Sequence, residues 1–233
     1  MKAVSQKLLR RLAYGAGAVL ACFLLAFAGP LALDRAFPPP LPEKLPVSAE
    51  VLDRDGQLLR AYAAPDGYWR LATRLDQVDP AFVDMLIAYE DKRFREHAGV
   101  DPLAIARAAL QLAGEGRIVS GGSTLSMQLA RLIEPRDGRS VAAKLKQALR
   151  ALQIERRLSK DEILELYLTL APYGGNLEGV RAASLAWFGK EPKRLAVSEA
   201  ALLVALPQLP EKRRPDRNRT AAQAARDRVL QRM

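Results

Sequence analysis

The sequence has 233 residues, which is enough to bury a hydrophobic core in one medium-sized domain with an appendage, but few for two full domains. The formal net charge of +10 suits anionic partners, such as an anionic bilayer, a phosphorylated substrate or nucleic acid. The one cysteine, Cys22, excludes a disulfide framework and a zinc site built from cysteines.

The N-terminal part contains an uncharged, mostly apolar run over residues 12–33. At about 1.5 Å per residue, a helix of this length crosses the roughly 30 Å hydrocarbon layer of a membrane. Basic residues precede the run, so the positive-inside rule puts Met1 in the cytoplasm and the rest of the chain on the far side. The alternative is a cleaved signal peptide, with a small-residue site at 26–28, but the run is long for such a peptide. We therefore predict a cytoplasmic tip and a transmembrane anchor over residues 1–36.

A proline-rich stretch follows the predicted anchor and indicates an extended spacer over residues 37–47. The remaining residues, 48–233, are predicted to form one domain. It begins with two short apolar runs around Asp55-Gly56, and this pattern predicts a β-hairpin over residues 51–59.

From Asp79 onward the apolar residues recur with helical spacing, so the predicted fold class is mainly α. Prolines, hydroxyl residues and glycines mark where the helices begin and end. The chain ends inside a helical pattern, which suggests a domain separated from a longer protein. The predicted helices are 80–90, 102–113, one capped by Ser123 or Thr124, 141–158, one opened by the capping box at 159–162, 177–188, one capped by Ser198 and ended by Pro207, and one from Asn218 or Thr220 to Met233.

Reactive side chains gather just after the helix predicted at 80–90. Glu90 stands at its C-terminal end, and Asp91 and the only histidine, His97, follow in a loop. A carboxylate in this position can act as a general acid or base if an apolar wall raises its pKa. The alternative is that this charged run is a solvated face, and that Asp91 and His97 hold the loop by hydrogen bonds.

A second candidate feature is the turn Gly121-Gly122-Ser123-Thr124 before a predicted helix. Its free backbone N–H groups and hydroxyls have anion-binding geometry, although an ordinary helix cap has the same sequence. It lacks the full phosphate-loop pattern, which argues against a nucleoside triphosphatase. Lys144, Lys146 and Arg150 on the helix at 141–158 could offset a phosphorylated ligand, or could equally form a solvated basic face.

Four motifs follow one another along the chain. They are Glu90-Asp91-x-x-Phe94-x-x-His97-x-Gly99, Gly121-Gly122-Ser123-Thr124-Leu125-x-x-Gln128-Leu129, Lys160-x-x-Ile163-Leu164-x-x-Tyr167-Leu168, and Trp187-Phe188-Gly189-Lys190. In this order they resemble the motifs of the family 51 glycosyltransferases, which are the peptidoglycan glycosyltransferase domains of class A penicillin-binding proteins. The resemblance covers nearly all of residues 47–233, and residues 171–190 resemble the 1C branch of this family in particular.

The resemblance implies a lysozyme-like, mainly helical lobe beside a small membrane-proximal lobe, with a cleft between them. It implies polymerisation of lipid II into β-1,4-linked glycan, with release of undecaprenyl pyrophosphate and with Glu90 as the general base. Lys144 and Arg131 match cations that bind the pyrophosphate. The other positions that the resemblance assigns to substrate binding are Asp91, Phe94, His97, Gly122, Ser123, Thr124, Gln128, Gln147, Arg150, Lys160, Tyr167 and Asn176.

The sequence departs from the family pattern at the position of a second glutamate, which is Gln147 here. The resemblance implies a divalent cation, Mg²⁺ or Mn²⁺, as a cofactor, but an amide cannot coordinate a metal as a carboxylate does. Metal dependence is therefore in doubt, and no metal ligand is predicted. Met127 and Thr169 also differ from the residues that many members carry.

The resemblance further implies a single-pass protein of the bacterial inner membrane with its catalytic domain on the periplasmic side. The expected partners are lipid II, the growing glycan chain, the membrane and other cell-wall synthesis or division proteins, and not nucleic acid. No Ser-x-x-Lys or Lys-Thr-Gly motif occurs, so the transpeptidase half is absent from this sequence. Two alternatives stay open, namely a lytic enzyme that cleaves glycan and a non-catalytic membrane-anchored scaffold.

Overall fold

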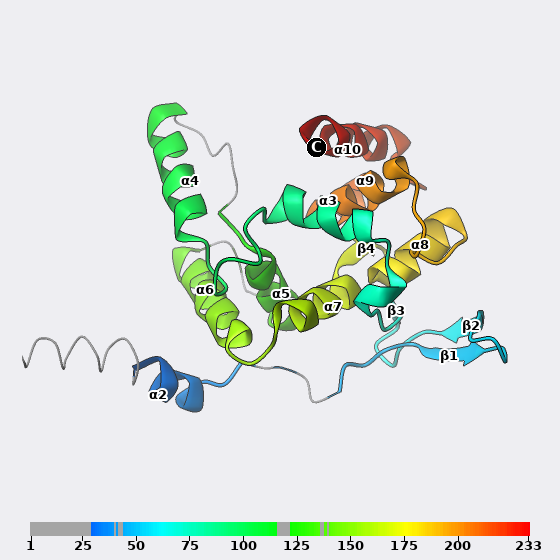
Figure 1. The fold of residues 1–233 in the computed structure, drawn as a ribbon, viewed down its shortest axis with the longest axis horizontal. Helices are drawn as coiled ribbons and strands as arrows, with labels where there is room; N and C mark the ends of the chain where they lie inside the picture. Colours follow the sequence, from blue (N-terminus) through cyan, green and yellow to red (C-terminus); the bar gives the residue numbers. More distant parts are fainter. Residues whose placement is uncertain (1–28, 40, 42–43, 116–121, 136–137, 139) are drawn as a thin grey trace, which may run out of the picture. The chain divides into compact units, whose positions relative to one another are not determined.

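The computed structural model describes residues 29–39, 41, 44–115, 122–135, 138 and 140–233. The chain falls into two compact units, one up to Pro40 and one from Leu41 to Met233. In the first unit, Gly29–Ala36 forms helix α2 (Figure 1). Among the described residues, no helix has the length and apolar character needed to cross a membrane. The anchor predicted over residues 12–33 lies mostly outside the described residues and stays a prediction.

The first two strands of the second unit form the predicted hairpin, which is confirmed. Strand β1 (Ala49–Leu52) pairs antiparallel with β2 (Leu58–Tyr62). The Asp53 carboxylate accepts hydrogen bonds from the backbone N–H groups of Asp55 and Gln57, at 2.9 and 2.8 Å, and thereby closes the turn.

A small three-stranded sheet was missed by the sequence analysis. It consists of β3 (Trp69–Arg70), β4 (Pro172–Gly174) and β5 (Leu177–Glu178), with β5 in the middle, parallel to β3 and antiparallel to β4. The prediction that a helix begins at Leu177 was therefore wrong. The physical reason is Gly179, whose φ of +83° interrupts a right-handed helix, so α8 starts only at Val180.

The rest of this unit is helical, and the predicted mainly α class is confirmed. Asp79 caps α3, Thr124 caps α5, the Ser159 capping box opens α7, and Asn218 caps α10. The helices are α3 (Pro80–Glu90), α4 (Pro102–Glu115), α5 (Leu125–Ile133), α6 (Val141–Glu155), α7 (Lys160–Leu170), α8 (Val180–Phe188), α9 (Val197–Ala205) and α10 (Arg219–Arg232), with short 3₁₀ turns η2 (Leu75–Gln77), η3 (Leu206–Gln208) and η4 (Glu211–Arg213).

Further helix boundaries differ from the sequence prediction, and α4 continues to Glu115, beyond the predicted residue 113. Helix α6 ends at Glu155, before the predicted Leu158, and the three residues 156–158 then lead to the Ser159 cap. Helix α9 begins directly after Ala196, so Ser198 lies inside the helix and does not cap it. The Glu199 carboxylate accepts a hydrogen bond from the Ala196 backbone N–H at 2.7 Å and closes the first turn.

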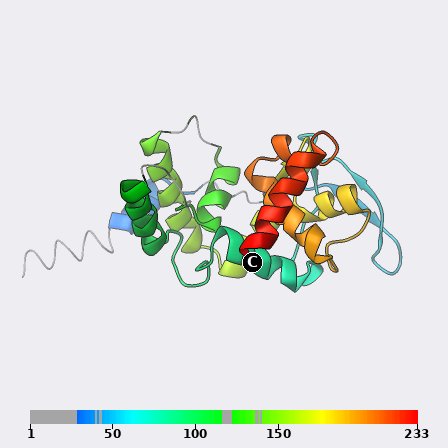
Figure 2. The same ribbon diagram turned by 90° about the horizontal axis from the view of Figure 1, so that it is seen from above.

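The core lies where α3, α5, α7 and α9 pack together. Phe82 and Leu86 on the inner face of α3 are buried, as the helical spacing predicted, and they join Leu129 of α5, Leu168 of α7 and Leu203 of α9 in one cluster. Within this unit α4 and α6 lie at one end and α8, α9 and α10 at the other, with α3, α5 and α7 between them (Figures 1 and 2). The C-terminal end of α3 consequently faces the middle of the unit.

A buried arginine ties α8 to the hairpin. The Arg181 guanidinium pairs with Glu191 at 2.8 Å and with Glu50 of β1 at 3.1 Å, and it also donates to the Ala72 carbonyl oxygen at 3.0 Å. The hydrogen bond to Glu191 is the largest cause that raises the pKa of Arg181 above its ordinary value, and desolvation opposes it. The cation thus links two segments more than a hundred residues apart in the sequence.

We expect Arg181→Met to lower the free energy of unfolding by about 3 kcal/mol, because it leaves Glu50 and Glu191 without their shared cation. Urea unfolding of the purified protein measures this change. The control is Arg74→Met, which removes an exposed pair with Asp76 and is expected to cost less than about 1 kcal/mol. Equal losses in the two variants would contradict a special role for Arg181.

Candidate active site

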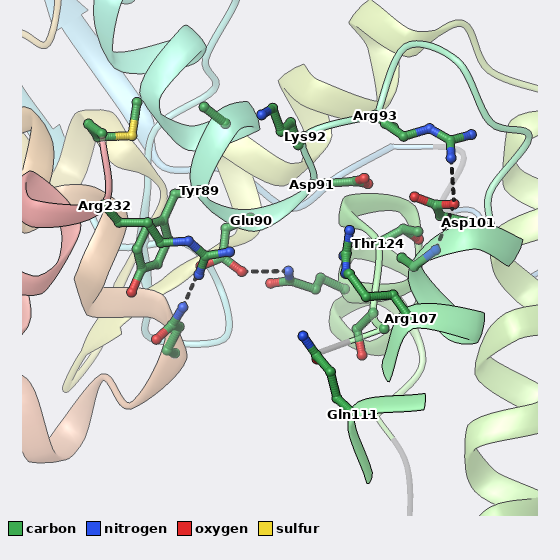
Figure 3. A pocket seen from close by; sticks show the side chains of 17 residues that line it. Tyr89, Glu90, Asp91, Lys92, Arg93, Asp101, Arg107, Gln111, Thr124 and Arg232 are labelled. Atoms are coloured by element: carbon green, nitrogen blue, oxygen red, sulfur yellow. Dashed lines mark hydrogen bonds and ion pairs between the residues drawn. The ribbon is translucent and has the colours of Figure 1, made fainter. Parts of the chain in front are cut away.

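A cavity of about 610 Å³ opens at the C-terminal end of α3. Figure 3 shows Glu90 and Arg232 on one side of it, and Arg107 and Gln111 of α4 on the other. Its walls also include the loop after α3, the turn before α5, the turn η3 and the last residues of α10. The lining residues include Tyr89, Glu90, Asp91, Lys92, Arg93, Asp101, Arg107, Gln111, Gly122, Ser123, Thr124, Gln128, Gln208 and Arg232.

Glu90, the last residue of α3, has a hydrogen bond on each carboxylate oxygen. The Gln128 amide nitrogen donates to Oε2 at 2.9 Å, and the Gln208 amide nitrogen donates to Oε1 at 2.6 Å. Both donors are neutral, and a carboxylate has further lone pairs, so the group retains acceptor capacity towards the cavity. The arrangement fixes the carboxylate and leaves it able to accept a proton.

Tyr167 lies behind Gln128, and its hydroxyl is 3.4 Å from the Gln128 amide oxygen. The ring is 2% exposed. Burial first, and the charge of Glu90 second, raise the pKa of the Tyr167 hydroxyl well above its ordinary value. Tyr167 is thus a neutral hydrogen-bonding group beneath the cavity floor and does not line the cavity itself.

Asp91 and His97 form a buried pair in the loop after α3. His97 Nε2 is 3.0 Å from both carboxylate oxygens of Asp91, and His97 Nδ1 accepts from the Gly99 backbone N–H at 3.1 Å. Because Nδ1 is an acceptor, the proton of the ring lies on Nε2 and points to Asp91. Desolvation raises the pKa of Asp91, and hydrogen bonds from the Leu125 backbone N–H and from His97 oppose that shift. His97 therefore shapes its loop, as one of the sequence interpretations expected.

The turn before α5 packs against this loop. The Thr124 hydroxyl donates to the Gly99 carbonyl oxygen at 2.5 Å and accepts from the Met127 backbone N–H at 3.1 Å. Gly99 has a φ of +99°, and a Cβ there would lie 2.8 Å from the backbone of Ala151, so only glycine fits. Ser123 of the same turn lines the cavity, and its hydroxyl accepts a hydrogen bond from the Lys144 ammonium of α6. Lys144 consequently stands at the cavity edge.

Three other predicted residues lie together in a second, much smaller hollow between α5 and α6. Gln147 is buried, and its amide nitrogen donates to the Met127 carbonyl oxygen. Arg150 pairs with Glu134 at 2.8 Å, and Arg131 is exposed at the rim. Residues that the sequence grouped with Glu90 are therefore divided between two neighbouring surfaces of α5.

Phe94, Lys160 and Asn176 lie away from the cavity. Phe94 is fully buried in the core, and the Lys160 ammonium is 4.4 Å from its ring centroid. Lys160 also donates to the His97 carbonyl oxygen at 2.6 Å and therefore supports the loop from below. Asn176 donates to the Gly67 carbonyl oxygen at 3.1 Å, beside the small sheet. The predicted contact of these residues with substrate stays a prediction.

Several lining residues were not predicted, and two of them, Gln208 and Arg232, come from the C-terminal part of the chain. Gln208 belongs to η3, where the sequence showed only Pro207 as the end of a helix. Arg232 lies with its guanidinium carbon 4.9 Å from the centroid of the Tyr89 ring (Figure 3). Neither belongs to a motif, and each reaches the cavity only because α9 and α10 pack together beside α3.

The described side chains near Glu90 form no cluster of carboxylates that would hold Mg²⁺ or Mn²⁺ without a contribution from substrate. Both carboxylate oxygens of Glu90 accept from amides, the carboxylate of Asp91 is taken by His97 and Leu125, and Gln147 presents its amide nitrogen to a carbonyl oxygen. Across the described ranges, no three side chains of His, Cys, Asp or Glu gather as a cation site requires.

Comparison with known proteins shows that residues 55–233 match the family model described as Transglycosylase. The chain is 46% identical over 219 residues to penicillin-binding protein 1C of Escherichia coli (strain K12), which covers 91% of this chain and 28% of that protein. It is 37% identical over 219 residues to penicillin-binding protein 1A of the same organism, and this match covers 91% of this chain and 25% of that protein. The chain also matches a crystal structure of penicillin-binding protein 1A from Haemophilus influenzae, with 22% sequence identity and a TM-score of 0.43. This match covers 82% of this chain and 18% of that chain. The chain thus spans about a quarter of the length of these curated relatives.

We expect Asp91→Asn to lower the free energy of unfolding by about 1–3 kcal/mol. The amide nitrogen replaces one of the two carboxylate oxygens that lie 3.0 Å from His97 Nε2 and so places a donor against a donor. His97 cannot move its proton to Nδ1, which faces the Gly99 N–H. Chemical denaturation measures the loss. Asp161→Asn, at an exposed pair with Arg95, is the matched control and should be nearly neutral. An unchanged free energy of unfolding in Asp91→Asn would show that the protein does not need the buried charge for its stability.

Proposed function

Since the chain belongs to the transglycosylase family, we propose that it is a peptidoglycan glycosyltransferase that polymerises lipid II into β-1,4-linked glycan strands and releases undecaprenyl pyrophosphate. The observation that carries this proposal is the Glu90 carboxylate, held by two amides at the wall of a cavity of about 610 Å³. A lysozyme-like fold with a small membrane-proximal lobe is part of the same proposal.

In the proposed reaction Glu90 is the general base. It takes the proton from a sugar hydroxyl of the acceptor while that oxygen forms a bond to the anomeric carbon of the growing chain. The bond from this carbon to the pyrophosphate oxygen breaks, and its electron pair leaves with undecaprenyl pyrophosphate. A sugar alcohol is a poor nucleophile, so a positioned base is the group that this chemistry most needs. The two amide donors to Glu90 support this role, because they orient the carboxylate without protonating it.

The leaving pyrophosphate requires positive charge. We propose Lys144 and Arg131 for this role, since cations at developing negative charge lower the barrier. What supports Lys144 is its hydrogen bond to Ser123, a residue of the cavity wall. The proposed substrate contacts within the cavity are Gly122, Ser123, Thr124 and Gln128.

We also propose that residues 12–33 anchor the protein in the bacterial inner membrane, with the catalytic domain on the periplasmic side. The uncharged run with basic residues before it supports this orientation. A lipid-linked donor and acceptor would then reach the domain by lateral diffusion, so the membrane is a partner. Lipid II, the growing glycan chain and other cell-wall synthesis or division proteins are the further partners proposed.

One assay tests the proposed reaction against its alternatives. Purified protein is incubated with labelled lipid II and, separately, with preformed glycan. Growth of glycan chains from lipid II is the expected result. Release of fragments from preformed glycan would instead make the protein a lytic enzyme, and no reaction with either would make it a scaffold.

We expect Glu90→Gln to lower the rate of chain growth by about 100-fold or more, because an amide cannot take the hydroxyl proton. The measurement is the initial rate with labelled lipid II. Glu96→Gln is the matched control, since Glu96 is exposed and pairs only with Arg93 among the described residues. Chain growth at the wild-type rate in Glu90→Gln would remove Glu90 from the mechanism.

We expect Lys144→Ala to lower turnover on the order of 10- to 100-fold, and to shift the melting temperature by less than about 4 °C, which is equivalent to ~1 kcal/mol. Lys146→Ala removes the same charge from the same helix at a side chain that pairs with Glu134, and its turnover should be unchanged. A collapse of the melting temperature in Lys144→Ala would make Lys144 structural.

A further inference from the structure

The two oxygens of Glu90 are reached from segments far apart in the sequence. Gln128 lies on α5, inside one of the motifs, whereas Gln208 lies on the 3₁₀ turn η3, outside all of them. The Gln208 hydrogen bond is the shorter of the two, at 2.6 against 2.9 Å. The sequence offers no reason for Gln208 to be near Glu90, so the contact depends on the packing of α9 against α3.

The direction of the Gln208 amide is set by a neighbour. An amide side chain can present either its oxygen or its nitrogen, and the two are told apart by their partners. Arg213 Nη1 lies 3.0 Å from Gln208 Oε1, and a guanidinium is only a donor. The oxygen of Gln208 must therefore face Arg213, which turns the amide nitrogen to Glu90.

The Arg213 side chain is itself held in place by a second hydrogen bond. The same Nη1 donates to the Ala205 carbonyl oxygen at the end of α9, at 2.5 Å, and the side chain is half-buried between η4 and α9. For Gln128, the partner of the amide oxygen is the Tyr167 hydroxyl at 3.4 Å, which can donate or accept. Among the described residues, Gln208 thus has a second partner that fixes the direction of its amide, whereas the second partner of Gln128 does not fix it.

We propose that Gln208 and Arg213 are positioning residues for Glu90: Arg213 sets the direction of the Gln208 amide, and Gln208 holds the carboxylate so that its remaining lone pairs face the cavity. This inference rests on the proposed function and names two residues that the motifs do not contain. Positioning matters because a shift of about 1 Å of a reacting group can cost roughly 100-fold in rate.

The first test is Gln208→Met, which keeps the length of the side chain and removes the amide donor. We expect kcat for chain growth from labelled lipid II to fall on the order of 10- to 100-fold, with KM within about two-fold of wild type. Gln208 is exposed, so the variant should fold normally. The matched control is Gln223→Met, at an exposed position on α10, and its kcat should be unchanged. A Gln208→Met variant that behaves like this control overturns the proposal.

The second test asks whether Arg213 acts through Gln208. If it does, the double variant Gln208→Met with Arg213→Met has the same kcat as Gln208→Met alone. If the two residues act independently, the double variant shows the product of the two single reductions in kcat, and this result would contradict the proposal. Arg213→Met also removes the bond to Ala205, so Arg213→Lys is measured beside it, because a lysine retains a cationic donor. We expect Arg213→Lys to keep the wild-type melting temperature and to retain more kcat than Arg213→Met.

A third measurement does not depend on turnover. In protein labelled with ¹⁵N-glutamine, the side-chain amide signal of Gln208, assigned by its loss in Gln208→Met, should shift in both Glu90→Gln and Arg213→Met but not in Gln223→Met. An unchanged signal overturns the arrangement whether or not the protein polymerises lipid II. Conversely, a wild-type protein that leaves lipid II unchanged refutes the proposed function. Even then, the shifts of the amide signal decide whether Glu90, Gln208 and Arg213 act together.

Discussion

The candidate site depends on the buried carboxylate of Asp91. It accepts from the Leu125 backbone N–H at 2.9 Å and from His97 Nε2 at 3.0 Å, and so joins the end of α3 to the first turn of α5. Because Glu90 precedes Asp91 and Gln128 lies three residues after Leu125, the same hydrogen bond sets Glu90 beside Gln128. Without this hydrogen bond, the ends of α3 and α5 that carry Glu90 and Gln128 would not be joined at this point.

A buried carboxylate is costly unless it is hydrogen-bonded, and here a second layer of polar contacts supports the loop that carries its donor His97. The Lys160 ammonium of α7 donates to the His97 carbonyl oxygen and to Glu155 of α6, both at 2.6 Å. Glu155 in turn accepts from the Ser126 hydroxyl of α5. Three helices therefore share one network beneath the loop that follows Glu90.

Local signals made much of this fold predictable. The Asp55-Gly56 turn, the helical spacing of apolar residues in α3 and the Ser159 capping box each act over a few residues, and each predicted its element correctly. The strand at Leu177 could not be predicted in this way, because it exists through pairing with Trp69, more than a hundred residues earlier. The same reason applies to the site: Glu90 stood out by its motif, whereas Gln208 becomes a partner of Glu90 only through tertiary packing.

The amide at position 147 can be understood from its surroundings. Gln147 is 6% exposed, and its nitrogen donates to the Met127 carbonyl oxygen in α5. An ionised carboxylate could not make this hydrogen bond, because both groups would be acceptors. Gln147 therefore fixes the register of α6 against α5, and Lys144, which lies nearly one turn earlier on the same helix, meets Ser123 as a result of that register. The hydrogen bond between α6 and α5 is thus one that an amide donates and that an ionised glutamate at position 147 would lose.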